Sequence, residues 1–259
     1  MARDILGRMT SLQKRSFTCW AVSSQDCGLG PSREHIVSNG LFPERSVHVS
    51  GFDWCKGETR SVGVNAIARQ ILCRKHNSAL SEVDAEAIKA IAFFQRSEPP
   101  ASAGPPGSNH IDGHKLERWL LKTAINVAYG GDLHLGVGMA GSKPGLPSPY
   151  LVDVALGKRP FEAKMGAYFL FPDGETRHNP HEIVLIPLIK EGCIGGFYFE
   201  LRSQAVFLSL LPGHAPPKLG ALARLDLQEE LLNAQLVFRP PMIAGIANDR
   251  PISLIRFAW

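Results

Sequence analysis

Residues 71–84 read ILCRKHNSALSEVD, and the interpretation of the whole chain depends on this stretch. It places a thiol, an imidazole and a carboxamide close together, at Cys73, His76 and Asn77. Such a group is either the ordinary start of a helix or half of a metal site. If it is half of a metal site, the remaining ligands must come from another part of the sequence.

The residues that follow Asn77 predict a helix. Asn77 or Ser78 is suited to cap its first turn, because a short polar side chain accepts a hydrogen bond from an otherwise unpaired backbone amide. Apolar side chains then recur at intervals of three and four residues, which places them on one face of a helix. These residues are Leu80, Val83, Ala87, Ile91 and Phe94.

Residues 97–109, SEPPASAGPPGSN, are rich in proline and glycine and predict a linker or an exposed loop. Beyond them, residues 112–131 have the apolar spacing of a second helix, which Gly130 and Gly131 would end. Short apolar runs then predict a mostly antiparallel sheet, and the turn PDGET (172–176) predicts a hairpin. The runs are YLVDVAL (150–156), GAYFLF (166–171), EIVLIPLI (182–189), GGFYFELR (195–202), AVFLSLL (205–211), AQLVF (234–238) and ISLIRFAW (252–259).

The composition is that of a globular protein, with 44% hydrophobic and 20% charged residues. No apolar run is long enough to cross a bilayer, and residues 1–20 lack the hydrophobic centre of a secretory signal. We therefore expect a cytoplasmic protein without a membrane partner. In that compartment the five cysteines are expected to be thiols or metal ligands rather than disulfides.

Positive charge collects in the first part of the chain. Residues 1–80 contain 11 Lys and Arg against 6 Asp and Glu, a net charge of +5, while the whole chain carries +4. A basic face suits a polyanion such as nucleic acid. A basic surface that only maintains solubility explains the same charge equally well.

A second motif, Glu34-His35-Ile36, lies upstream of the opening stretch. Together with Cys73-Arg74-Lys75-His76-Asn77 it resembles the HNH endonucleases, which have a ββα-metal site. In many members a carboxylate-His dipeptide on a first strand is followed by C-x-x-C-N or C-x-x-H-N where a helix begins. The resemblance covers roughly residues 17–95 and includes an acidic residue at Asp84.

This resemblance implies metal-dependent hydrolysis of phosphodiester bonds in nucleic acid, with DNA favoured over RNA. His35 would be the general base, and Glu34 and Asn77 would bind a catalytic Mg²⁺ or Mn²⁺. Because neighbouring residues on a regular strand point to opposite faces, we expect a local irregularity near Glu34. The middle residue of the motif, which orients the base, is not evident. Three residues are alternatives, with His48 slightly preferred over the others: Asn39, His48 and Asn65.

The resemblance also implies a structural Zn²⁺ site of four thiol and imidazole ligands. Cys73 and His76 would form its second half, and Cys19 and Cys27 its first half. Seven residues separate Cys19 from Cys27, whereas the family usually has two, so Cys55 stays an alternative ligand.

The sequence thus predicts an α+β protein. Residues 1–96 would form an HNH-like ββα-metal zinc module, residues 97–109 a linker, and residues 110–259 a β-rich domain with one packed helix. The β-rich domain would bind a protein partner or form a homo-oligomer. The residues expected to contact nucleic-acid phosphates are Arg33, Arg74 and Lys75. The alternative is a non-catalytic, zinc-stabilised module with a degenerate HNH fold that binds nucleic acid or protein.

Overall fold

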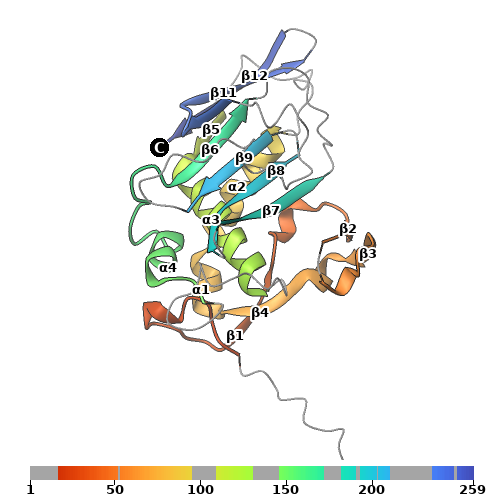
Figure 1. Ribbon diagram of the computed structural model, residues 1–259, viewed down its shortest axis with the longest axis vertical. Helices are drawn as coiled ribbons and strands as arrows, with labels where there is room; N and C mark the ends of the chain where they lie inside the picture. Colours follow the sequence, from red (N-terminus) through yellow and green to blue (C-terminus); the bar gives the residue numbers. More distant parts are fainter. Residues whose placement is uncertain are drawn as a thin grey trace, which may run out of the picture.

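The computed structural model combines helices with antiparallel sheets, an α+β arrangement (Figure 1). It describes the following residues: 17–51, 53–94, 109–130, 146–171, 182–190, 193–202, 204–210, 235–247 and 250–259.

The N-terminal elements are built around one antiparallel strand pair, β1 (Pro31–His35) and β4 (Ala68–Cys73). Two helices follow β4 directly, α1 (Arg74–Ala79) and α2 (Ser81–Phe94). The chain between β1 and β4 forms a second antiparallel pair, β2 (Ser46–Val49) with β3 (Arg60–Gly63). The short 3₁₀ helices of this region are η1 (Val22–Ser24), η2 (Asn39–Leu41), η3 (Asp53–Cys55) and η4 (Val64–Ile67).

The pairing of β1 with β4 is irregular at the Glu-His motif. Two residue steps on β1, from Ser32 to Glu34, lie opposite three on β4, from Leu72 to Arg69. An extra residue of this kind is a β-bulge, which re-aims the side chains beside it. The expected irregularity near Glu34 is therefore confirmed.

The C-terminal part of the chain contributes two sheets. Five strands in the order β10-β6-β9-β8-β7 are all antiparallel to their neighbours. A three-stranded sheet has the order β11-β12-β5, in which β12 and β5 are parallel. The bounds are β5 (Asn109–Asp112), β6 (Gly166–Phe171), β7 (Ile183–Lys190), β8 (Cys193–Leu201), β9 (Gln204–Ser209), β10 (Gln235–Phe238), β11 (Met242–Ala247) and β12 (Arg250–Ala258).

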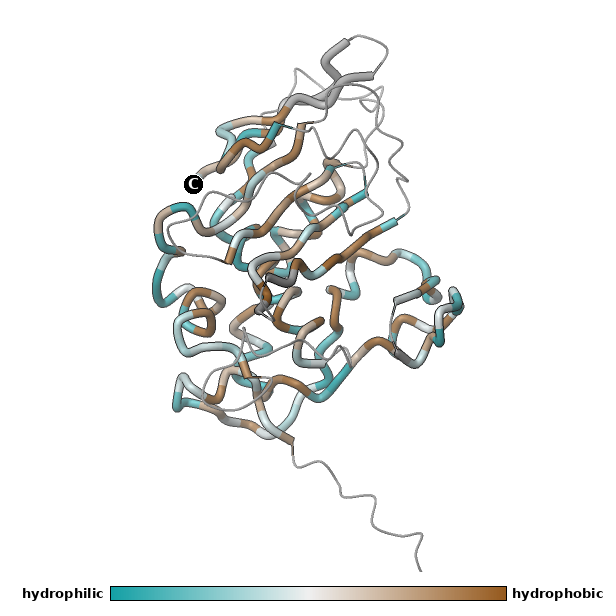
Figure 2. Tube along the Cα trace, in the orientation of Figure 1, coloured by the Kyte–Doolittle hydropathy of each residue, from teal (hydrophilic) through white to brown (hydrophobic). Residues whose placement is uncertain are grey.

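Helix α3 (Gly113–Gly130) lies between the N-terminal elements and the five-stranded sheet (Figure 1). Every residue from Trp119 to Val127 is buried, so the helix is enclosed on all its faces. Hydrophobic residues, brown in Figure 2, follow the strands of the large sheet beside it. One hydrophobic core contains Leu72 from β4, Leu120 from α3 and Phe199 from β8.

The two predicted units therefore contribute to the same core. Their division at residues 97–109 stays a prediction, because residues 97–108 lie outside the described part of the chain and Asn109 already begins β5. Both predicted helices are present, although a short break separates α1 from α2. Within the described ranges, no helix is both long and apolar enough to cross a membrane.

The prediction of a strand at residues 150–156 is wrong. These residues form most of helix α4 (Pro149–Ala155), which has proline at its first position. The Ser148 hydroxyl accepts a hydrogen bond from the backbone amide of Leu151 and caps the helix. Capping and the burial of both Val152 and Val154 outweigh the strand preference of the valines.

The hairpin predicted at PDGET (172–176) falls outside the described part of the chain. The strands on either side, β6 and β7, are not neighbours. Strands β9 and β8 lie between them in the sheet.

The core predicts a clear difference between two Leu→Ala substitutions. Leu120 is fully buried on α3, so Leu120→Ala is expected to lower the free energy of unfolding by about 2–5 kcal/mol. Leu29 is 75% exposed, so Leu29→Ala is expected to change it by less than about 0.5 kcal/mol. Urea denaturation measures both values. Equal losses for the two variants would contradict the central position of α3.

Candidate functional site

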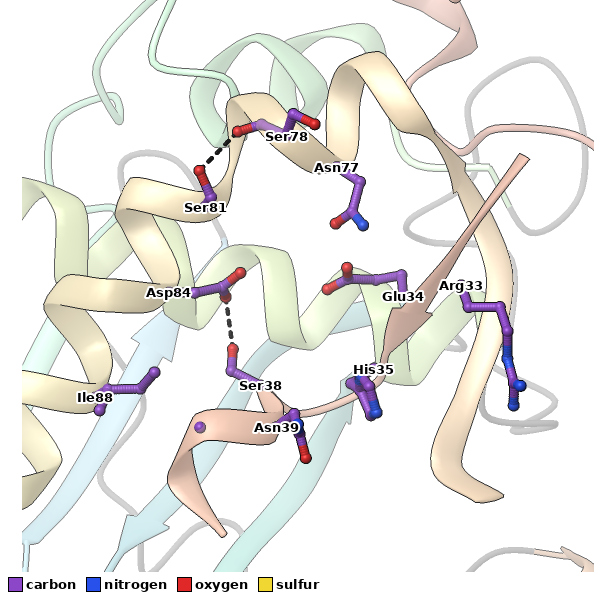
Figure 3. A pocket seen from close by; sticks show the side chains of 11 residues that line it. Arg33, Glu34, His35, Ser38, Asn39, Asn77, Ser78, Ser81, Asp84 and Ile88 are labelled. Carbon is purple, nitrogen blue, oxygen red and sulfur yellow. Dashed lines mark hydrogen bonds between the residues drawn. The ribbon is translucent and has the colours of Figure 1, made fainter. Parts of the chain in front are cut away.

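A pocket of about 380 Å³ opens between β1, the residues after it, and helices α1 and α2 (Figure 3). Its lining is polar and includes the predicted catalytic residues Glu34, His35 and Asn77. These residues come from two segments about 40 positions apart in the sequence, and the β1–β4 pair with the start of α1 brings them together.

Glu34 presents one carboxylate oxygen to the pocket. Its Oε1 forms an ion pair with Lys122 Nζ, at 2.6 Å, and accepts a hydrogen bond from Asn126 Nδ2, at 3.3 Å. Its Oε2 has no hydrogen-bond partner among the described residues, and it is not one of the buried unpaired atoms. Burial raises the pKa of Glu34, and the neighbouring Lys122 ammonium partly offsets this effect.

Asn77 presents an amide oxygen in the same way. Its Nδ2 donates a hydrogen bond to Ser32 Oγ at 2.9 Å, and its Oδ1 has no partner within the described ranges. Figure 3 shows the Asn77 and Glu34 side chains pointing toward one another. Two converging oxygen atoms of this kind fit a hard divalent cation such as Mg²⁺ or Mn²⁺.

His35 lies beside this pair with one ring nitrogen fixed. Its Nε2 is 3.2 Å from Asn65 Oδ1. Because an amide oxygen only accepts hydrogen bonds, Nε2 carries the proton and Nδ1 holds a lone pair. An imidazole in this tautomer can take a proton from a water molecule.

The three alternatives for the middle residue of the motif lie at different places relative to His35. The structure does not bring His48, the preferred alternative, to the pocket: it lies exposed on β2, opposite Ser61 of β3. Asn39 lines the pocket. Asn65 is the alternative that hydrogen-bonds to His35, because η4 places it immediately before β4, the strand that pairs with β1.

A hydrogen-bonded network beside the pocket was not assigned a function from the sequence, and its members are Ser38, Asp84, Trp119, Lys122 and Asn126. The Lys122 ammonium lies 2.7 Å from both oxygens of Asp84, and it also pairs with Glu34. The Ser38 hydroxyl donates to Asp84 Oδ1 and accepts from the indole Nε1 of Trp119. A signal for part of this network exists: Lys122 and Asn126 are polar residues four positions apart in an otherwise apolar helical segment.

A second cluster lies on the other side of α1. The sulfur atoms of Cys19, Cys27 and Cys73 and the Nδ1 atom of His76 all lie within 4.8 Å of one another. From His76 Nδ1 the distances are 3.2 Å to Cys73, 3.5 Å to Cys19 and 3.7 Å to Cys27. The predicted group of four is confirmed as a spatial cluster. The alternative, Cys55, lies elsewhere, with its thiol 3.7 Å from the Val49 carbonyl oxygen.

Local hydrogen bonds orient Cys73 and His76 toward the centre of this cluster. Cys73 ends β4 and caps α1, where its sulfur accepts a hydrogen bond from the His76 amide. The other ring nitrogen of His76, Nε2, is 2.8 Å from Asp26 Oδ1. A carboxylate only accepts, so Nε2 carries the proton and Nδ1 presents its lone pair to the sulfurs. Hydrogen bonds from Lys75, Ser24 and His76 hold the pKa of Asp26 well below its usual range.

The cluster has the donor chemistry of a zinc site. Burial raises the pKa of Cys19 to about 12 and also raises that of Cys27. For Cys73, burial is outweighed by hydrogen bonds from the backbone amides of His76 and Gly28, and its pKa is lowered. Cys₃His is a common tetrahedral donor set for Zn²⁺, and a bound ion would supply the positive charge that favours the thiolate form of these cysteines.

The predicted phosphate contacts lie on β1 and in the first turn of α1. Arg33 lines the pocket and donates a hydrogen bond to the Asn65 carbonyl oxygen. Arg74 and Lys75 are exposed in the first turn of α1, and Lys75 is paired with Asp26. All three residues are exposed to solvent.

Comparison of the chain with protein-family models, curated proteins and solved structures returned no match. The family resemblance therefore stays a prediction, and the functional argument depends on the geometry of the pocket and the cluster.

The buried network under the pocket predicts different effects for two serine substitutions. Ser38→Ala leaves the Trp119 indole N–H without its acceptor in the core, at an expected cost of about 1–3 kcal/mol. Ser81→Ala removes only an exposed hydroxyl that donates to the Ser78 carbonyl, at an expected cost below about 0.5 kcal/mol. Denaturant unfolding distinguishes the two. A Ser38→Ala protein as stable as Ser81→Ala would show that the Trp119 N–H finds another partner.

Proposed function

We propose that this protein is a metal-dependent endonuclease of the HNH type that hydrolyses phosphodiester bonds in nucleic acid, with DNA favoured over RNA. One observation carries the proposal: Glu34 Oε2, Asn77 Oδ1 and His35 Nδ1 are all without protein partners in the described chain and belong to side chains that line one pocket. Two oxygens and one lone-pair nitrogen are the groups that hydrolysis of a phosphodiester requires.

Each side chain has a separate task in this chemistry. Glu34 and Asn77 would hold a Mg²⁺ or Mn²⁺ ion, which would supply positive charge to the phosphate oxygens of the substrate. His35 Nδ1 accepts the proton of the attacking water, and the hydrogen bond to Asn65 holds the ring in the required tautomer. Arg33 lies at the pocket, and Arg74 and Lys75 lie on the adjoining surface, where they bind the phosphate backbone without reading its sequence.

The Cys₃His cluster has a structural task in this proposal. We propose that Cys19, Cys27, Cys73 and His76 bind a structural Zn²⁺. Asn77 follows His76 directly in α1, so a metal that fixes His76 also fixes the position of Asn77 relative to β1. The β-rich part of the chain would then be free to bind a protein partner or a second copy.

Two His→Ala substitutions test the catalytic assignment. Loss of a general base lowers turnover by about 10²–10⁴-fold, which is the expected effect of His35→Ala. His48→Ala is the matched control and is expected to retain activity, because His48 lies outside the pocket. The assay is cleavage of plasmid DNA with Mg²⁺ or Mn²⁺, with a chelator as the metal-free reference. Undiminished cleavage by His35→Ala would remove the basis of the mechanism.

The metal content tests the structural site. The purified protein is expected to contain about one Zn²⁺ per chain by elemental analysis, since Cys₃His sites bind a single ion. Cys73→Ser is expected to lose this zinc and to unfold at a lower temperature, because structural zinc contributes directly to folding. Cys55→Ser, which removes a buried thiol outside the cluster, is expected to keep the zinc. Zinc retained in Cys73→Ser and lost in Cys55→Ser would require a different ligand set.

One observation favours the alternative, a non-catalytic zinc-stabilised binding module. Glu34 is only 5% exposed and already paired with Lys122, so part of its charge is neutralised. In this case the protein would contain stoichiometric zinc and bind nucleic acid or a protein, and no cleavage would occur with either metal.

A further inference from the structure

Lys122 is a buried charge to which the proposed chemistry gives no task. Its side chain is 1% exposed and extends from α3 to β1 and α2. A buried ammonium is costly unless its N–H groups are all paired. The partners of the Lys122 ammonium therefore indicate the role of this charge at the pocket.

Lys122 and its neighbours occupy three of the four carboxylate oxygens at the pocket. The ammonium lies 2.6 Å from Glu34 Oε1 and 2.7 Å from each oxygen of Asp84. Two of the three N–H donors of the ammonium bond to the Asp84 oxygens, and Glu34 is held by the ion pair. Ser38 adds a hydrogen bond to Asp84 Oδ1, and Asn126 adds one to Glu34 Oε1. Glu34 Oε2 is the oxygen left without a partner in the described structure.

A cation held between two carboxylates is the arrangement found in enzymes that use two metal ions. In such sites the ions lie roughly 3.5–4 Å apart and share carboxylate ligands. Here the Lys122 ammonium lies between the two carboxylates, where a second metal ion would bind, and it carries a single positive charge. The group of Glu34, Asp84 and Lys122 then keeps a net charge of −1 when all three are ionised, directed into the pocket through Oε2.

We propose that Lys122 is a positioning residue that takes the place of a second metal ion. It fills the space between Glu34 and Asp84, so the pocket binds one divalent cation, on Glu34 Oε2 and Asn77 Oδ1. This inference rests on the proposed function, because it takes Glu34 and Asn77 to be the ligands of the catalytic ion.

The test counts Mn²⁺ ions bound to the zinc-loaded protein, by following free Mn²⁺ with electron paramagnetic resonance. The unsubstituted protein is expected to bind one ion, and Glu34→Gln none. Lys122→Met keeps the length of the side chain and removes its charge, which leaves two carboxylates without a counter-ion. It is expected to bind two ions. A count that stays at one or falls to zero in a folded Lys122→Met protein overturns the inference, since a purely structural lysine would change only the melting temperature.

Two further variants keep the inference testable if Lys122→Met does not fold. Lys122→Met with Asp84→Asn restores the net charge of −1 and is expected to bind one ion. Asp84→Asn alone retains the ammonium and is expected to bind one ion at least threefold more weakly. Loss of all binding in Asp84→Asn would make Asp84 itself a ligand and overturn the inference. If the unsubstituted protein binds no Mn²⁺, or Glu34→Gln binds it unchanged, the proposed catalytic ion site fails as well.

Discussion

Because the middle of helix α3 is enclosed on every side, each buried polar group on the helix must find a partner inside the protein, and these partners hold the fold together. Glu117 pairs with Arg239 and accepts a hydrogen bond from the backbone amide of Ala167 on β6, which connects the helix to the five-stranded sheet. Lys122 pairs with acidic residues of β1 and α2. Asn126 accepts from the Trp20 indole and donates to Glu34. Breaking any of these contacts leaves an unpaired polar group in the core, which is more costly than the contact is favourable.

The same network joins the two candidate sites. Trp20 follows Cys19 of the thiol cluster, and its indole reaches Asn126, which also contacts Glu34 at the pocket. On the other side, His76 of the cluster directly precedes Asn77 of the pocket. Two connections of this kind, one through packed side chains and one through the backbone, hold the cluster and the pocket in a fixed relation. A structural metal at the cluster would therefore stabilise the geometry of the pocket without touching a substrate.

Local patterns in the sequence predicted the elements and the groups that depend on short-range spacing. Apolar periodicity predicted α2 and α3, and the resemblance to the HNH family, with the three-residue spacing of Cys73 and His76, implied the thiol cluster. The failures involve contacts between distant residues. No local signal separates Asn65 from His48 as the partner of His35, since only the paths of η4 and β2 distinguish them. Likewise the order of β6 and β7 depends on where β8 and β9 insert, which their own sequences do not encode.

The position of α3 in the sequence has a consequence for synthesis of the chain. The Glu-His motif and the CRKHN segment are synthesised early. Lys122 and Asn126, which contact the Glu34 carboxylate, lie more than 80 positions after Glu34 in the sequence. During vectorial synthesis a nascent N-terminal segment therefore carries every proposed catalytic side chain but lacks the charge that holds Glu34 in place. A pocket built in this way becomes complete only when α3 has emerged and packed, so the order of translation itself delays the appearance of a finished site.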